Sequence, residues 1–272
     1  MLEKYFKPGR ITQIIGEMKS LKESFVSIYT AHKAAKDCTK VIYICSKPTL
    51  NMRYIYEVHK NIEKDSFSEE NLEKQYLFFE FIKFDSMGDF ILNHLPILLE
   101  KEKTVSTVII NNLNNFFTTY SYKFTHDPKI YCSQLIFLAR KFGINVIYLN
   151  DIFYYCETKF LQKFNNYNNP ELPLNKNNYN FINNIYMNPE ENNDEIEEYY
   201  NKEPVNSDMV SEYCSHTLIA ESRKQRNFYG NIDDEDCIEQ GIFRVVKSKY
   251  KPHQNYLVTI NKKDFTYNIE IS

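Results

Sequence analysis

The stretch GRITQIIGEMKSLKE, residues 9–23, decides the fold. It begins as a short apolar strand, Gly16 provides a tight turn, and a helical pattern begins at about Leu21. This is the strand–loop–helix context of a phosphate-binding loop, whose pattern is Gly-x-x-x-x-Gly-Lys-Ser/Thr. Gly16 fills the first glycine and Lys22 the lysine. Leu21 stands where the second glycine belongs, and Glu23 stands where the hydroxyl belongs.

Both departures fall on positions with a chemical task. The second glycine permits positive φ and close approach of the backbone to phosphate, and the side chain of Leu21 obstructs both. The hydroxyl ligates magnesium, whereas the carboxylate of Glu23 can hold a cation but repels phosphates. The stretch therefore predicts a nucleotide-binding fold that has lost its nucleotide. The alternative is an ordinary strand–glycine–helix junction.

Composition restricts the class of protein. With 272 residues and 43% hydrophobic content, the chain can form one large α/β domain, although its length leaves two domains possible. It contains no apolar run near the roughly 18 residues of a membrane span, and residues 1–10 lack the apolar stretch of a signal peptide. Its six cysteines form no C-x-x-C pair, which indicates reduced thiols of a cytosolic or nuclear protein.

The net charge of −3 is unevenly distributed. Residues 189–208 hold eight carboxylates and one lysine, and residues 233–236 hold four more carboxylates. The rest of the chain is therefore mildly basic, which allows contact with nucleic acid without establishing it.

Strand-like and helix-like segments alternate through the first half of the chain, which predicts an open, largely parallel sheet with right-handed crossovers. Ser86 followed by Asp89 resembles a capping box that opens a helix, and Pro96 should kink that helix or shift its start. Gly143 is expected just after the end of a helix. The expected strands are 41–45, 76–84, 105–110 and 144–149; the expected helices are 23–35, 51–62, 86–98 and 130–142; and 66–74 is expected as a polar connector.

The pattern breaks between residues 157 and 212, which are rich in Asn, Tyr and acidic residues and show no periodicity. We expect a disordered insertion within a single domain that spans residues 1–272. Four later segments are spaced as hairpins, so the sheet should finish with antiparallel strands. These segments are 217–221, 241–246, 256–260 and 265–269.

Taken in order, these segments resemble the core of the RecA-type recombinase family, in particular the eukaryotic strand-exchange recombinase paralogues. The resemblance covers residues 1–156 and 213–272 and rests on the order and spacing of the motifs. It implies an α/β fold, a RecA-like P-loop ATPase core with a largely parallel sheet and C-terminal antiparallel strands. Beyond the opening stretch, the matching segments are KVIYICSKPTL (40–50), STVIINNLNNFF (106–117), LARKFGINVIYLND (138–151), HTLIAESRKQR (216–226) and FRVVKS (243–248).

The chain departs from the family at further chemical positions. Lys47 stands where the family has its water-activating glutamate, and Asn111 where it has the magnesium-binding aspartate. Asp151 stands where it has the glutamine that senses the γ-phosphate. With Leu21 and Glu23, these changes predict a pseudo-ATPase with degenerate Walker motifs, no catalytic residue, no metal and no cofactor.

Of the side chains that contact the nucleotide in this family, the chain retains the loop lysine, Lys22. A lysine without its phosphate is expected to be solvated at the surface. The rival hypothesis is a DNA-dependent ATPase with a divergent but working site, in which Glu23 holds magnesium and Lys22 holds phosphate.

The resemblance also implies a function. Such a core resembles the Shu-type and other recombinase paralogues, which are nuclear accessory subunits in homologous recombination and DNA repair. The expected partners are another recombinase paralogue in a heterodimer or larger complex, the recombinase itself, and single-stranded DNA, with no membrane. Tyr5 and Phe6 are a short candidate for the family's aromatic docking peptide, and the alternative is packing on their own sheet. A protein-only scaffold without DNA contact is the third hypothesis.

DNA contact in this family comes from two loops at the carboxyl edge of the sheet, here residues 118–132 and the segment after Asp151. Aromatic residues interleaved with lysines suit base stacking and phosphate neutralisation. The alternative is that these loops cover an apolar surface or meet a partner chain. The DNA-binding candidates are Lys123, Lys129, Lys159, Lys163, Arg223, Lys224 and Arg226.

Overall fold

The computed structural model describes residues 2–16, 21–46, 50, 52–111, 128–151, 155–156, 200–201, 213–222, 238–248 and 254–272. The chain divides into two units, Met1–Asp151 with Asn206–Ser272, and Ile152–Val205. In the second unit, the described residues are the antiparallel strands β6 (Tyr155–Cys156) and β7 (Tyr200–Asn201). All that follows concerns the first unit.

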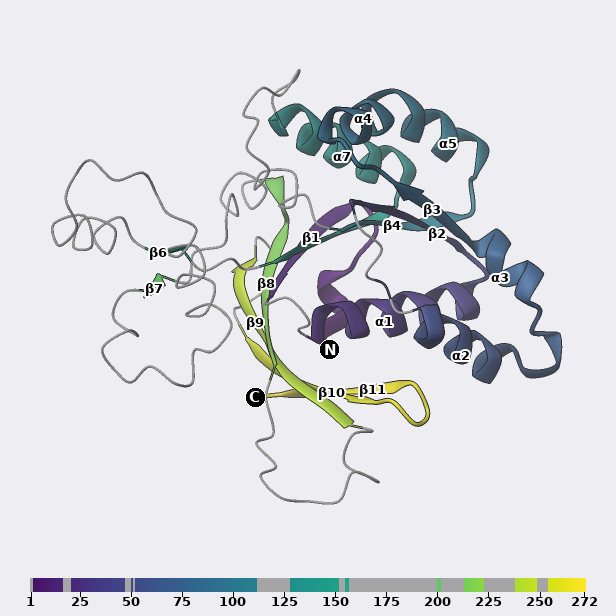
Figure 1. Cartoon of the computed structure of the whole chain (residues 1–272), viewed down its shortest axis with the longest axis vertical. Coiled ribbons are helices and arrows are strands. Elements are labelled where there is room, and N and C mark those ends of the chain that lie inside the picture. Colours follow the sequence, from purple (N-terminus) through teal and green to yellow (C-terminus); the bar gives the residue numbers. More distant parts are fainter. Residues whose placement is uncertain are drawn as a thin grey trace, which may run out of the picture. The chain divides into compact units, whose positions relative to one another are not determined.

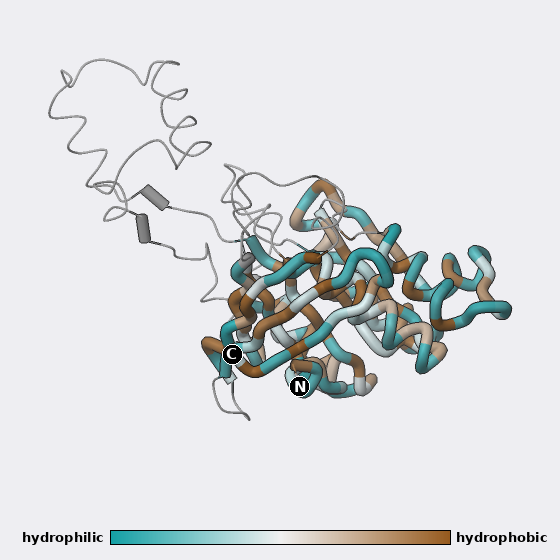
Figure 2. Tube along the Cα trace, turned by 90° about the horizontal axis from the view of Figure 1, so that it is seen from below, coloured by the Kyte–Doolittle hydropathy of each residue, from teal (hydrophilic) through white to brown (hydrophobic). Residues whose placement is uncertain are grey.

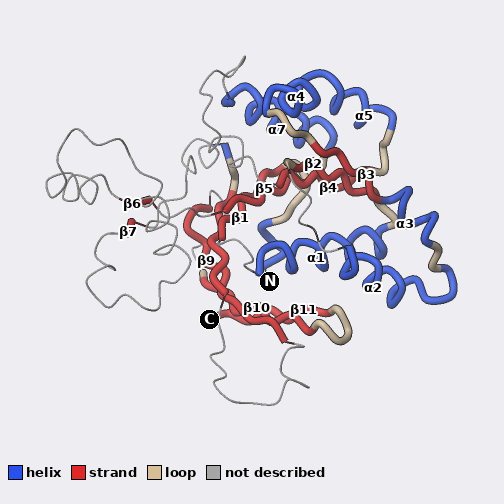
Figure 3. The backbone as a smooth tube through the Cα atoms, viewed as in Figure 1, coloured by secondary structure: helices blue, strands red, loops and turns tan. Residues whose placement is uncertain are grey.

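A nine-stranded sheet forms the centre of this unit in the part of the chain that is described, in the order β11-β10-β9-β8-β1-β5-β4-β2-β3 (Figures 1 and 3). The six strands from β8 to β3 are parallel, and β9, β10 and β11 continue the sheet in antiparallel fashion. The predicted fold class is thus confirmed. The strands are β1 (Arg10–Gly16), β2 (Lys40–Cys45), β3 (Tyr76–Glu80), β4 (Val105–Asn111), β5 (Asn145–Asp151), β8 (His216–Ser222), β9 (Ile238–Ser248), β10 (Asn255–Asn261) and β11 (Thr266–Ile271).

Helices cover both faces of the parallel part of the sheet. In Figure 1, α1 and α2 lie on one face, and α4, α5 and α7 lie on the other. The α-helices are α1 (Leu21–Asp37), α2 (Met52–Glu63), α3 (Glu69–Gln75), α4 (Phe84–Asp89), α5 (Leu95–Lys101) and α7 (Pro128–Phe142). Shorter turns are the 3-10 helices η1 (Leu2–Tyr5) and η2 (Lys64–Ser66) and the π-helical turn η3 (Phe90–His94).

The core accordingly has two apolar clusters, one on each face. Ile109 of β4 and Ile147 of β5 pack with α1, whereas Val108 and Val146 pack with α7 and α5. Strands buried on both faces read as continuous apolar runs, which is why β2, β4 and β5 were recognisable in the sequence. The strands beyond β8 are less buried, β10 has every second residue buried, and Figure 2 shows hydrophobic and hydrophilic residues alternating along the tube.

The antiparallel strands bend around the side of α1 (Figure 3). Phe25 of α1 packs against these strands. Its ring centroid lies 5.0 Å from that of Phe243 of β9 and 5.5 Å from that of Tyr267 of β11. Tyr5 and Phe6 are also buried in this region. Phe6 contacts Phe25. This is the second of the two interpretations given above, packing on the chain's own sheet.

The polar connector predicted at 66–74 is wrong, because α3 begins at Glu69. Leu72 is the buried residue of this helix, so the segment has no apolar periodicity to read. Its helical signals are electrostatic instead: Glu69 and Glu70 lie in the first turn, and Glu70 pairs with Lys74 one turn later.

The predicted capping box is also wrong. The helix α4 begins at Phe84, before Ser86, and β3 ends at Glu80 instead of running to 84. The carboxylate of Asp89 accepts a hydrogen bond from Asn93.

The prediction for Pro96 is confirmed. It lies in the first turn of α5, where a missing N–H is tolerated, and the wider turn η3 precedes it. Gly143 follows α7 with φ of +63°, as predicted. Among the described helices, none is long and apolar enough to cross a membrane.

Candidate functional site

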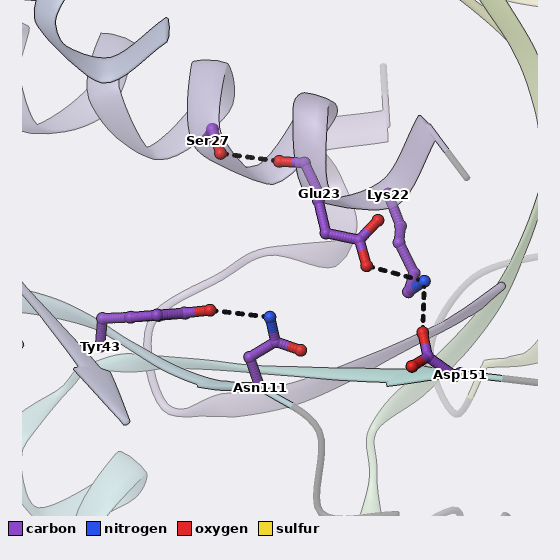
Figure 4. A network of polar contacts seen from close by, with 6 residues as sticks. All are labelled: Lys22, Glu23, Ser27, Tyr43, Asn111 and Asp151. Carbon is purple, nitrogen blue, oxygen red and sulfur yellow. Dashed lines mark hydrogen bonds and ion pairs between the residues drawn. The ribbon is translucent and has the colours of Figure 1, made fainter. Parts of the chain in front are cut away.

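The carboxyl ends of the parallel strands bring the altered positions together. In the sheet register Gly16 pairs with Asp151, and Asn111 pairs with Leu149. The helix α1 begins at Leu21 above this edge, so its first turn faces the ends of β5 and β4 (Figure 4). Residues that are far apart in the sequence therefore form one site.

Lys22 is fully buried at this site, so the expectation of a solvated lysine is wrong. Its Nζ atom lies 2.8 Å from Glu23 Oε1 and 2.8 Å from Asp151 Oδ1 (Figure 4). A buried ammonium needs a compensating anion, because removing a charge from water is costly. In this chain the compensating anions are two of its own carboxylates.

The cluster of Lys22, Glu23 and Asp151 carries one more negative than positive charge when all three groups are ionised. Burial raises the pKa of Glu23, and the charge of Asp151 adds to this, while the ammonium of Lys22 lowers it. Glu23 Oε2 is buried and receives no hydrogen bond in the described part of the structure. The raised pKa means that Glu23 protonates more readily than it would in water.

Asn111, which the family resemblance places at the position of the magnesium-binding aspartate, makes its contact within the fold. It is 2% exposed, and its Nδ2 donates a hydrogen bond of 2.7 Å to the hydroxyl of Tyr43 on β2. A neutral amide is a weaker ligand for magnesium than a carboxylate, because magnesium prefers charged oxygen donors. Sequence analysis missed Tyr43, because its place beside Asn111 follows only from the pairing of β2 with β4.

Leu21, at the position of the second glycine, is a core residue with no exposed surface. It packs against Gly241 of β9, where an added Cβ would lie 3.0 Å from Leu21 Cδ2 and 2.6 Å from the backbone oxygen of Glu221. Leu21 therefore packs the first turn of α1 against β9, and it fits because the residue opposite it in β9 is a glycine.

These features determine what the site can do with a phosphate. To bind it, Lys22 would have to leave two ion pairs, and the phosphate would enter beside Glu23 and Asp151. Two like charges 4 Å apart repel by about 4 kcal/mol at an effective dielectric constant of 20. The site as folded therefore disfavours anions.

The remaining candidates are placed as follows. Gly16 ends β1 and pairs on both sides, with β5 and β8. Lys129 lies in the first turn of α7 and is exposed. The other predicted positions lie outside the described residues: Lys47, Lys123, Lys159, Lys163, Arg223, Lys224 and Arg226.

Comparison with known proteins bears on the fold. No family model matches the sequence, and no curated protein matches it. A solved structure titled "Crystal structure of the RadB recombinase" superposes with a TM-score of 0.58 at 12% sequence identity. The match covers 97% of this chain and 94% of the other. The fold is a RecA-like core. Sequence identity this low shows a shared fold and nothing about the chemistry of the site.

Proposed function

We propose that this chain is a non-catalytic recombinase paralogue, a subunit of a heteromeric complex that assists assembly of a recombinase filament on single-stranded DNA. The observation that carries the proposal is the state of Lys22. This chain has a RecA-like fold, yet its Lys22, at the position of the loop lysine, is buried and paired with two carboxylates of the same chain. Nuclear localisation and a role in homologous recombination and repair are part of the same proposal.

The charges at this site oppose ATP turnover. Phosphoryl transfer depends on cations that neutralise the developing charge and on groups that position the attacking water. Here the loop lysine is already neutralised, Glu23 adds a negative charge, and Asn111 donates its amide to Tyr43. Each change removes a part that such catalysis requires.

Isothermal titration calorimetry with MgATP tests this point against the working-ATPase alternative. We expect no binding in the micromolar range for the native chain or for Lys22→Ala. The informative variant is Glu23→Ser with Asp151→Gln, which frees the lysine of both carboxylates and should raise nucleotide affinity if those carboxylates exclude it. Micromolar binding by the native chain that Lys22→Ala abolishes would establish the ATPase instead.

The exposed edge of the sheet at β3 supports the proposal that this chain binds a partner chain. This strand is the last of the sheet, and no described strand pairs with its outer side. Phe78 on it is 44% exposed, and Ile82 just after it is 92% exposed. An unpaired edge with exposed apolar side chains is a template for association. We expect poor solubility until a second recombinase paralogue is co-expressed, whereas a monodisperse monomer in light scattering would contradict the proposal.

Contact with DNA is tested by fluorescence anisotropy with labelled single-stranded oligonucleotide at two salt concentrations. Binding through phosphates must weaken as salt rises, because bound counterions are released. Among the candidates, Lys129 is the described one, and Lys129→Ala should weaken binding more than the control Lys103→Ala, which removes another exposed lysine. Absence of salt-dependent binding would favour the protein-only scaffold.

A further inference from the structure

Lys22 connects two elements that lie far apart in the sequence. It belongs to the first turn of α1, and its ammonium contacts Asp151, the last residue of β5. In the other described pairs between lysine or arginine and a carboxylate, the cation is at least 27% exposed. Lys22 therefore makes this contact in the driest surroundings, where salt and water screen a charge pair least.

The sheet register shows what this contact holds. Gly16 pairs with Asp151 on one side and with Ala220 on the other, so β1 and β5 end side by side and β8 continues two residues beyond them. The first turn of α1 meets this region through two side chains. Leu21 packs against β9, and Lys22 binds the end of β5. The start of the helix is thus attached to the sheet at two separate places.

We propose that the Lys22–Asp151 ion pair is an internal clamp, which fixes the first turn of α1 to the carboxyl end of β5 without a ligand. The N-terminus of a helix after a glycine loop ordinarily offers its amides and its dipole to a bound phosphate. Here a carboxylate from the neighbouring strand meets the lysine of that turn. This edge of the sheet then keeps one arrangement whether or not nucleotide is in solution. The inference rests on the proposed function, because a lysine that served MgATP would not be held in this way.

Hydrogen exchange measured by mass spectrometry on the full chain tests the clamp, because local opening exposes amides without global unfolding. The variant is Lys22→Met, which keeps the length of the side chain and removes the charge. The control is Lys40→Met, the same substitution in a partly exposed pair with Glu102. We expect Lys22→Met to speed exchange at least tenfold in 21–25 and 149–151 at labelling times too short for global unfolding to expose the centres of β2 and β4. Lys40→Met should leave 21–25 and 149–151 unchanged.

Unchanged exchange at 149–151 in Lys22→Met would overturn the clamp, and so would faster exchange there that appears only together with exchange at the centres of β2 and β4. If that variant does not fold, Asp151→Asn replaces it, since it preserves volume and leaves Lys22 paired with Glu23. It should loosen the same two segments. The calorimetry tests the proposed function independently of the clamp. If the native chain binds no MgATP and Lys22→Met leaves exchange unchanged, the clamp is rejected and the proposed function stands. Lys22-dependent MgATP binding would remove both.

Discussion

Removing the cation from the buried cluster tests the electrostatic argument most directly. Lys22→Met deletes the ammonium and retains most of the apolar length of the side chain. Glu23 and Asp151 then face each other without a counter-charge, with side-chain exposures of 16% and 9%. The perturbation therefore leaves two carboxylates in poorly hydrated positions.

The expected magnitude follows from measurements on buried pairs. Deleting one partner of a buried ion pair costs about 3–5 kcal/mol, because the remaining charge is left uncompensated. Both carboxylates retain some contact with water, which places the expected loss of unfolding free energy near the lower bound, at about 3 kcal/mol. For a protein of this size, about 2–4 °C of Tm accompanies each kcal/mol, so we expect Tm to fall by about 6–12 °C.

Differential scanning calorimetry at neutral pH measures this shift. Lys40→Met is the matched control, because its pair is 27% and 34% exposed and such pairs contribute at most about 1 kcal/mol. The triple variant Lys22→Met, Glu23→Gln, Asp151→Asn should recover at least half of the loss, since it leaves no buried charge. A Tm shift for Lys22→Met no larger than that for Lys40→Met would refute the reasoning.

Three further outcomes are expected. Burial and a nearby guanidinium lower the pKa of His216 from 6.5 to about 4. The stabilisation that comes from keeping His216 neutral is therefore fully present above pH 6.5 and is lost as the pH falls towards 4. This amounts to about 3 kcal/mol, and His216→Gln should flatten that part of a plot of urea-unfolding free energy against pH. Gly241→Ala should cost about 1–3 kcal/mol in urea unfolding, because the new Cβ meets the backbone oxygen of Glu221 at 2.6 Å. Gly88→Ala should cost a similar amount in the same assay, because its Cβ would lie 2.3 Å from the buried ring of Tyr131; unchanged stability in either variant would contradict the packing described.

Much of the architecture was predictable because the central strands are buried on both faces. Continuous apolar runs located β2, β4 and β5, and the helical stripe after Leu21 located α1. The two failures among the helices have separate causes. The helix α3 buries Leu72 alone and is supported by charges along its surface, and α4 begins at Phe84, ahead of the Ser86 side chain that resembled a cap.

The sequence selected several residues that lie together in the fold, but it did not show how they contact one another. The pattern of a phosphate-binding loop selected Leu21, Lys22 and Glu23, and the family resemblance selected Asn111 and Asp151; the structure brings these residues to one edge of the sheet. It also pairs Lys22 with two of the others, which no spacing could show. The pairing depends on β5 lying beside β1, a contact between segments distant in the chain.

By itself, the sequence determined the alternation of strands and helices and the departures of Leu21 and Glu23 from the pattern of a phosphate-binding loop, because both are properties of residue type and order. Only the tertiary structure decided whether Lys22 is buried and which groups it pairs with. A side chain is buried or solvated according to the neighbours that the fold supplies, and here the neighbours are Glu23 in the same helical turn and Asp151 at the end of a strand far along the chain. Their carboxylates satisfy the ammonium and allow it to remain in the interior of the protein.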